Sequence, residues 1–352
     1  MKKLILIFLM IPLLGFSQTT IQDAWIDEGI SYSDVIFEGT VNVMTTQKVK
    51  FTNCTFRSAE NGMNIYNGDG GDVEIINCTF VGLNPNQYGE TQGKAVHAWQ
   101  PAAIKFEHNT GVGFRGFWIQ EPKVGAPISV RYNHWTNIAG RPSDGSGGYL
   151  DEPDPNGENS QFVMVTDVQG GNVGVEWNYI KNVAYEGKVE DVINFFRCKG
   201  TAGNPLILAN NLVVGSYPYD PVSIKNYSGS GIQVEAESEY VHVSGNYMIN
   251  NGNTGIALSW TSNCKAFDNK IIHSGKIFGT DQYVCQVWRG LLLGNPFWHP
   301  DDSFDNEGYD NLVWYPENIN YCNGNNGYQV QAPIVCLNNN ECRNNDHRDS
   351  TP

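Results

Sequence analysis

Residues 49–56 (VKFTNCTF) and residues 73–80 (VEIINCTF) follow one eight-residue frame, in which apolar side chains alternate ahead of a Cys. Six further segments fit the same frame with Asn at the Cys position. They are IKFEHNTG (104–111), ISVRYNHW (128–135), VGVEWNYI (173–180), LILANNLV (206–213), VHVSGNYM (241–248) and, more loosely, CKAFDNKI (264–271). The shortest intervals are 23 and 24 residues, and a repeat of this length is typical of one coil of a β-solenoid.

The alternating residues of each segment predict a short strand with one face turned toward the interior. The column that all eight segments share consists of Cys54, Cys78, Asn109, Asn133, Asn178, Asn211, Asn246 and Asn269. An Asn at one place in every coil can stack as an amide ladder and stabilise a tight bend. Cys54 and Cys78 lie one coil apart in this column, where a buried thiol stack and a disulfide are both consistent with the sequence.

A second set of short apolar strands lies between these segments. Its members are residues 62–67, 94–99, 161–167, 191–198, 231–237 and 255–260. No amphipathic helix separates the strands, which excludes a doubly wound βαβ fold. Immunoglobulin-like sandwiches give no reason for a fixed long repeat. We therefore expect an all-β chain that folds as a parallel β-helix.

The open ends of a β-helix require caps, because uncovered edge strands pair with other chains. We expect a short amphipathic helix over residues 20–28 to cover the first coil. The tail loses the repeat, which predicts a β-helix domain over residues 18–280 and an irregular C-terminal cap region over residues 281–352. Residues 140–159 are a Pro/Gly/Asp-rich insertion, and a long loop of this kind is expected to build one side of a binding groove.

The N-terminus carries an export signal. Lys2 and Lys3 precede an eleven-residue apolar run and a Gly-Phe-Ser ending, which predicts a signal peptide over residues 1–17 and a secreted or periplasmic product. The apolar run is too short to span a bilayer, so we expect no membrane insertion. The formal charge of −15 argues against nucleic acid as a partner, because such binding needs clustered Lys and Arg.

Eight Cys in an exported chain suggest disulfides. Four of them lie in coil strands, where buried free thiols are plausible, namely Cys54, Cys78, Cys198 and Cys264. The other four lie in the tail and are enough for two bridges, namely Cys285, Cys322, Cys336 and Cys342. No spacing of Cys and His supports a zinc site.

The NCTF-type coils, the signal peptide and the stretch EDVINFFRCKG (190–200) resemble secreted right-handed parallel β-helix proteins of the pectate-lyase-like superfamily. The resemblance covers roughly residues 30–280. It implies a right-handed β-helix and a polysaccharide as substrate, since most members are polysaccharide lyases or glycoside hydrolases. The polygalacturonase-type pattern is incomplete here: Glu190 and Asp191 imitate its acidic pair, but Thr166 and Asp167 follow their strand, and residues 228–231 lack its His.

Outward side chains of successive coils line up about 4.8 Å apart and form a shallow groove for an extended polymer. With Ile232 and Val234 pointing inward, Gln233 and Glu235 point outward. We expect Arg197 beside that column. The substrate-binding candidates on this surface are His97, Trp99, Lys225, Gln233 and Trp260, because aromatic rings stack on sugars and polar groups bind hydroxyls.

A lyase needs a cation to neutralise the uronate carboxylate, a base to remove the C5 proton and an acid for the leaving oxygen. Lys188, Arg197 and Lys225 are candidates for base or neutraliser. Glu190, Asp191 and Glu235 are candidate catalytic acids and possible Ca²⁺ ligands. A second possible Ca²⁺ site is the acidic loop that contains Asp151, Asp154 and Glu158.

A glycoside hydrolase needs two carboxyl groups ~5–5.5 Å apart for retention or ~6.5–9.5 Å apart for inversion. Asp167, Asp191 and Glu235 are the candidates for that pair. A third hypothesis is a non-catalytic glycan-binding protein or adhesin, in which Trp99, Trp118, Trp135 and Trp260 would hold the glycan. Of the three, we favour β-elimination on a uronate-containing glycan, with hydrolysis second. The oligomeric state is not predicted.

Overall fold

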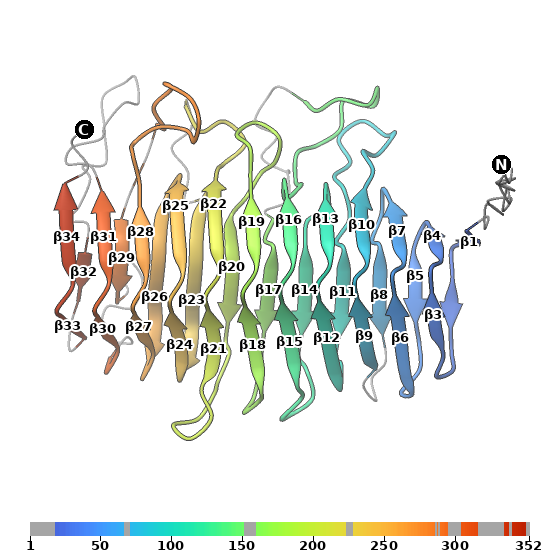
Figure 1. Ribbon diagram of the computed structural model, residues 1–352, viewed down its shortest axis with the longest axis horizontal. Helices are drawn as coiled ribbons and strands as arrows, with labels where there is room; N and C mark the ends of the chain where they lie inside the picture. The colour runs from blue at the N-terminus through green and yellow to red at the C-terminus, as the bar shows by residue number, and fades with distance from the viewer. Residues whose placement is uncertain are drawn as a thin grey trace, which may run out of the picture.

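The computed structural model describes residues 18–66, 71–150, 160–222, 228–285, 287, 289–294, 304–315, 334–337 and 340–349. In these ranges the strands form three parallel sheets, A, B and C, that run along the molecule (Figure 1). The chain visits the sheets in turn, so that each coil contributes one strand to each. The predicted right-handed parallel β-helix is confirmed. Across the described ranges we find no helix that could cross a membrane.

Sheet A has 12 strands, and sheets B and C have 11 each. Sheet A contains β1 (Thr20–Gln22), β4 (Ile36–Glu38), β7 (Thr55–Ser58), β10 (Thr79–Gly82), β13 (Thr110–Val112), β16 (His134–Thr136), β19 (Tyr179–Lys181), β22 (Leu212–Ser216), β25 (Tyr247–Asn251), β28 (Lys270–Ile272), β31 (Leu312–Tyr315) and β34 (Asp346–Asp349). Sheet B contains β2 (Trp25–Ile26), β5 (Val41–Val43), β8 (Met63–Tyr66), β11 (Val96–Trp99), β14 (Phe117–Gln120), β17 (Val163–Thr166), β20 (Asp191–Phe196), β23 (Ser230–Glu239), β26 (Thr254–Ser262), β29 (Arg289–Leu293) and β32 (Ile334–Cys336). Sheet C contains β3 (Ser31–Ser33), β6 (Lys48–Thr52), β9 (Asp72–Ile76), β12 (Ala103–Glu107), β15 (Ile128–Arg131), β18 (Val173–Glu176), β21 (Leu206–Ala209), β24 (Val241–Ser244), β27 (Lys265–Phe267), β30 (Glu307–Tyr309) and β33 (Glu341–Arg343).

The core is a column of apolar side chains inside the coils, because alternate residues of each strand point inward. In the first coils this column is aromatic. The ring of Phe56 stacks on Phe37 and on Phe80 with centroid distances of 5.2 and 4.6 Å. Trp135, which we considered for glycan binding, belongs to this core and is fully buried.

The predicted Asn ladder lies at the corner between sheets C and A. In each rung the side-chain Nδ2 donates to the Oδ1 of the Asn one coil later, as from Asn178 to Asn211 at 2.9 Å. The same Nδ2 donates to a buried carbonyl, such as that of Val130. At the start of the column Cys54 and Cys78 are free buried thiols, so the thiol stack is present and the disulfide is not.

The predictions for the two ends of the β-helix need correction. Residues 20–28 form no helix: they contain β1 and β2, which pair with β4 and β5, because pairing satisfies the backbone of the first coil. At the other end, six strands (β29 to β34) continue the three sheets beyond residue 280. The described part of the tail therefore extends the solenoid. It also contains the Cys336–Cys342 disulfide, and Cys285 is disulfide-bonded as well.

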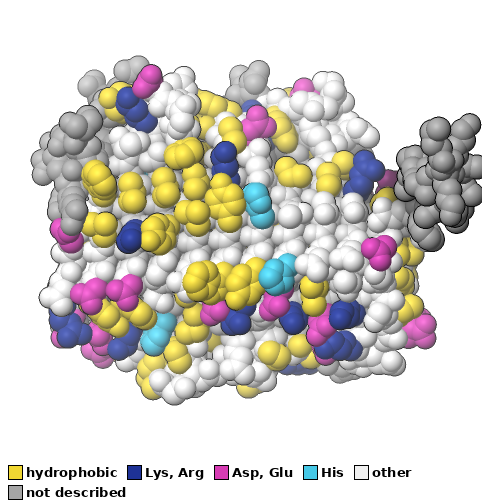
Figure 2. Space-filling model, viewed as in Figure 1, with side chains coloured by type: hydrophobic (Ala, Val, Ile, Leu, Met, Phe, Trp, Pro, Cys, Tyr) yellow, Lys and Arg dark blue, Asp and Glu magenta, His cyan; other side chains and the backbone are white. Residues whose placement is uncertain are grey.

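The residue before each ladder position has a positive φ, and most coils place Asn, Asp or Gly there. Three consecutive coils instead carry His108, Tyr132 and Trp177, each with a φ of 57°. The rings of His108 and Tyr132 stack at 4.9 Å. Figure 2 shows hydrophobic and histidine side chains in rows along this face. Bulky residues are strained in this conformation, so these three positions store strain.

Candidate functional site

The outer face of sheet B carries the predicted site column. Strand register aligns one side chain per coil from the N-terminal end, in the order Trp25, Asn42, Asn64, His97, Trp118, Met164, Asn194, Gln233, Ala257 and Leu292. A second outward column contains Tyr66, Trp99, Gln120, Thr166, Phe196, Glu235 and Ser259. The predicted inward register of Ile232 and Val234 is confirmed, since both are fully buried.

A hollow of about 260 Å³ lies where β11, β14 and β17 begin. Lys94 and Arg115 enter it from neighbouring coils, each two residues ahead of the first inward residue of its strand. Trp118 forms part of the wall, and the Lys94 ammonium lies 4.2 Å from the centre of its ring. Gln161 and Glu190 close the other side, joined by a hydrogen bond of 2.8 Å from Gln161 Nε2 to Glu190 Oε2.

The surroundings of Lys94 and Arg115 in this hollow disfavour the charged forms of both side chains. Burial is the main cause that lowers the pKa of Lys94 to about 8, and the neighbouring Arg115 lowers it further. Burial also lowers the pKa of Arg115 to about 10. Two partly desolvated cations that repel one another gain most from an anion placed between them. This arrangement therefore suits a ligand carboxylate, and it supplies an amine that can lose its proton near neutral pH.

His97 lies beside this hollow on the predicted face. Its ring stacks on Trp118 with a centroid distance of 5.6 Å, and Nε2 lies 2.9 Å from Gln120 Oε1. The Tyr66 hydroxyl lies 3.5 Å from Nδ1. Burial is the main cause that lowers the pKa of His97, with smaller effects from Lys94 and Arg115, so the ring is held neutral.

Asp191 and Glu235 form a second cluster further along the face. Asn194 Nδ2 donates to Asp191 Oδ2 at 2.9 Å and to Glu235 Oε1 at 2.8 Å. The two carboxyl oxygens therefore lie no farther apart than the sum of these two bonds, less than ~6 Å, which is too close for the ~6.5–9.5 Å separation of an inverting pair. Gln233 Nε2 also approaches Glu235, at 3.4 Å.

The environment of Asp191 favours the protonated form of its carboxyl group. Burial raises its pKa well above the usual value, and the nearby Glu190 and Glu235 carboxylates raise it further. Asp191 is only 6% exposed and Asn194 only 3% exposed. In its protonated form the Asp191 carboxyl group can act as an acid, but the surrounding protein buries it.

Arg197 and Asp167 form an ion pair next to the second outward column, where Arg197 was expected. Arg197 forms an ion pair with Asp167 through hydrogen bonds of 2.6 and 3.0 Å, and its side chain is 52% exposed. Both residues follow their strands at positive φ, 54° and 60°. At this corner the chain leaves sheet B, and the Arg197 guanidinium lies 4.6 Å from the centre of the Phe196 ring, which belongs to the second outward column.

The other predicted residues are scattered. Lys188 is half-buried in the segment that leads into β20, next to buried Val189, which bridges to Ser160. Trp99 is exposed on the second column. Trp260 is half-buried at a kink in β26 where φ is 58°. Four predicted residues lie outside the described ranges, namely Lys225, Asp151, Asp154 and Glu158.

Calcium binding remains a prediction. Within the described part of the chain, no three His, Cys, Asp or Glu side chains form a group that could hold a metal ion. Glu190, Asp191 and Glu235 are therefore not such a group in this structure.

The sequence interpretation missed Lys94 and Arg115, although it identified His97 and Trp99, three and five residues after Lys94. A signal was present. Lys94-Ala-Val and Arg115-Gly-Phe place a cation at the same offset before two sheet B strands. Residues that share an offset in neighbouring coils must lie side by side in a solenoid.

The fold and this surface define a class: a right-handed parallel β-helix whose sheet B carries a cationic hollow next to aromatic side chains. Compared with known proteins, the chain matches no family model, no curated protein and no solved structure.

Proposed function

We propose that this chain is a secreted or periplasmic polysaccharide lyase that cleaves a uronate-containing glycan by β-elimination. The observation that carries the proposal is the pair Lys94 and Arg115, two partly buried cations side by side on an open face lined with aromatic rings. Export rests on residues 1–17, which lie outside the described ranges.

In the proposed reaction the Arg115 guanidinium pairs with the uronate carboxylate and so makes the C5 proton more acidic. The neutral Lys94 amine removes that proton. The electron pair of the C5–H bond forms the C4–C5 double bond, and the bond from C4 to the glycosidic oxygen breaks. The leaving oxygen takes up one proton from solvent water, and we assign its relay to His97; the Lys94 ammonium then returns the C5 proton to solvent. Trp118 and Trp99 would stack on neighbouring sugars.

The test uses the purified mature protein on a panel of uronate and neutral polysaccharides, with and without Ca²⁺. It follows the ultraviolet absorbance of the unsaturated product and the new reducing ends together. Both signals should rise on a uronate polymer. Lys94→Met should lower the rate by about 10²–10⁴-fold, as for loss of a general base. Lys105→Met is the matched control, because Lys105 lies exposed on sheet C, and it should keep full activity. Reducing ends without absorbance would refute elimination.

Hydrolysis is the second candidate, because Asn194 donates to both Asp191 and Glu235 and burial raises the pKa of Asp191. Burial of Asp191 and Asn194 ranks it lower, since a sugar could reach them only after the covering residues move. Under hydrolysis, Asp191→Asn would abolish the release of reducing ends, whereas elimination would survive this change.

A further inference from the structure

We infer that a hollow at the first coils binds an uncharged sugar, so that the glycan carries neutral sugars next to the uronate. The binding of a neutral sugar is independent of the reaction. That this neutral sugar belongs to the same polysaccharide as the uronate rests on the proposed function.

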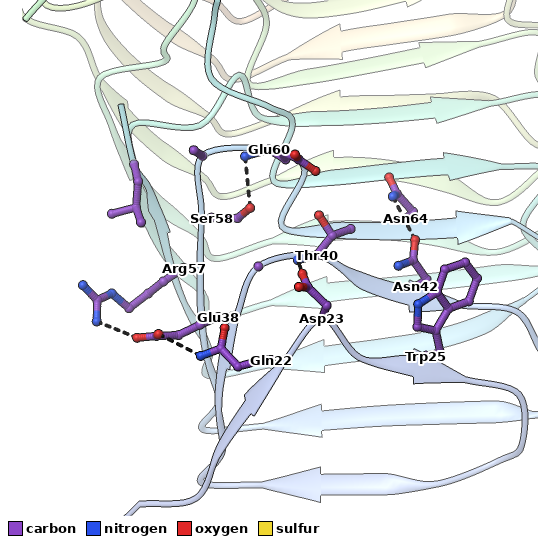
Figure 3. A pocket seen from close by; sticks show the side chains of 13 residues that line it. Gln22, Asp23, Trp25, Glu38, Thr40, Asn42, Arg57, Ser58, Glu60 and Asn64 are labelled. Carbon is purple, nitrogen blue, oxygen red and sulfur yellow. Dashed lines mark hydrogen bonds and ion pairs between the residues drawn. The ribbon is translucent and has the colours of Figure 1, made fainter. Parts of the chain in front are cut away.

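The hollow has a volume of about 730 Å³ and lies at the corner between sheets A and B. Figure 3 shows Trp25, Asn42 and Asn64 on one side and Asp23, Glu38 and other polar side chains on the opposite side. The Trp25 side chain that lines this cavity is 72% exposed.

This hollow is in line with the candidate site. Trp25, Asn42, Asn64, His97 and Trp118 occupy one outward column of sheet B on five successive coils. At ~4.8 Å for each coil, Trp25 lies about 19 Å from Trp118. A polysaccharide that follows the column from the cationic hollow therefore reaches Trp25 after a few sugars.

The side chains match the chemistry of a sugar ring. An indole face packs against the C–H groups of a pyranose. Beside it, Asn61 Nδ2 donates to Asn64 Oδ1 at 2.8 Å, and Asn64 Nδ2 donates to Asn42 Oδ1 at 3.0 Å. This chain of amides fixes the orientation of Asn42, so that its Nδ2 serves as a donor next to Trp25.

The charge of the hollow selects against a uronate. Three carboxylates line it, from Asp23, Glu38 and Glu60, against the single guanidinium of Arg57. Arg57 is already paired with Glu38 at 3.1 Å. The negative charge of a uronate would be repelled here, whereas sugar hydroxyls can donate to the carboxylates. The Lys94 hollow has the opposite preference, so one face binds an anionic sugar at one point and a neutral sugar at another.

Asp23 is held in place for this role. Its Oδ1 accepts the N–H of Thr40 at 3.0 Å. Gly39, with a φ of 85°, leaves room for that carboxylate, because a Cβ at this position would collide with Asp23 Oδ1. The carboxylate is thus oriented before a ligand arrives, which lowers the entropy cost of binding.

The experiment measures the binding of neutral tetrasaccharides by titration calorimetry: xylotetraose, cellotetraose, mannotetraose and galactotetraose. We expect the wild type to bind at least one of them and Trp25→Ala to weaken that binding at least tenfold. Trp177→Ala is the matched control, since Trp177 is 54% exposed on another corner, and it should bind like the wild type. Absence of neutral binding, or equal binding by Trp25→Ala, would overturn the inference.

Two further variants separate this inference from the proposed function. Lys94→Met should lose elimination and keep its affinity for the neutral tetrasaccharide. The double variant Asp23→Asn, Glu60→Gln should bind a uronate tetrasaccharide more tightly than the wild type, and no gain would overturn the charge argument. If the wild type shows no elimination but binds neutral sugar through Trp25, the proposed reaction is refuted and the neutral site is supported.

Discussion

The Lys94 ammonium lies 4.2 Å from the centre of the Trp118 ring, on the neighbouring coil. Burial and the adjacent Arg115 lower the pKa of the amine to about 8, and the ring face attracts its charged form. No ion pair to Lys94 occurs among the described residues. The indole thus holds the amine in place while leaving it easy to deprotonate.

The first prediction concerns the pH dependence of elimination. Because the neutral amine is the base, kcat/KM should rise with pH and level off above about 8, the pKa of Lys94. A bound uronate carboxylate favours the charged form of Lys94 and so raises its pKa. The increase in kcat should therefore occur at a higher pH than the increase in kcat/KM. A profile that falls between pH 6 and 8 would contradict the role of Lys94.

Asp191→Asn should stabilise the protein. The pKa of Asp191 is raised in the folded state, so the folded chain binds more protons than the unfolded chain above the ordinary Asp pKa, and stability declines as pH rises through that window. Asn keeps the contact with Asn194 and removes the titration. The melting temperature of the variant should exceed that of the wild type by a margin that grows from pH 4 to pH 8. A constant margin would contradict the assigned cause.

Arg197→Ala should have little effect, contrary to the expectation from sequence. Its ion pair with Asp167 is exposed to solvent, and such pairs contribute about 0–1 kcal/mol. We expect full activity and a small loss in the free energy of unfolding, measured by urea titration. A loss of activity comparable to that of Lys94→Met would return Arg197 to the catalytic site.

Asn178→Ala tests the ladder. The change removes the acceptor for the N–H and Nδ2 of Asn133, at 3.1 and 2.8 Å, and the donor to the Val130 carbonyl. Buried groups without partners cost ~1–3 kcal/mol each, so the free energy of unfolding should fall by about 3–5 kcal/mol. Asn172→Ala, at an exposed amide that contacts Asn204, is the control, and its effect should stay within ~0.5 kcal/mol.

Trp177→Asn should raise stability by about 1 kcal/mol, because Asn tolerates the left-handed conformation that strains Trp177. The reciprocal change, Asn210→Trp, places the same strain on the next coil, where φ is also 57°. It should lower stability by a similar amount. If both variants melt at the wild-type temperature, the positive φ at this corner is not a source of strain.

The sequence predicts the coils well, because inward apolar residues and the Asn column recur wherever the backbone makes the same bend. It fails in the tail for a physical reason. The inward position that Val49, Val73 and Ile104 occupy in earlier coils carries Asn306 and Asn340 later, and these form an amide ladder of their own, with Nδ2 to Oδ1 at 2.8 Å. The apolar alternation is therefore lost although the coils continue.

The site was harder to predict, because loops of unequal length hide which side chains lie on neighbouring coils. Sequence alone placed His97, Trp99, Gln233 and Glu235 on one face, and the strand register agrees. The pairing of Arg197 with Asp167 depends on a positive φ at two strand ends, which the strand pattern does not reveal.

Every amide rung described above points the same way. The N–H and Nδ2 of Asn109, Asn133, Asn178, Asn211, Asn246, Asn269 and Asn311 all donate to the Asn of the following coil. A completed coil therefore presents a ready template of two donors to the next stretch of chain, which has only to bring one oxygen. Growth of the solenoid thus has a built-in polarity, and a chain that emerges N-terminus first meets its template in the right order.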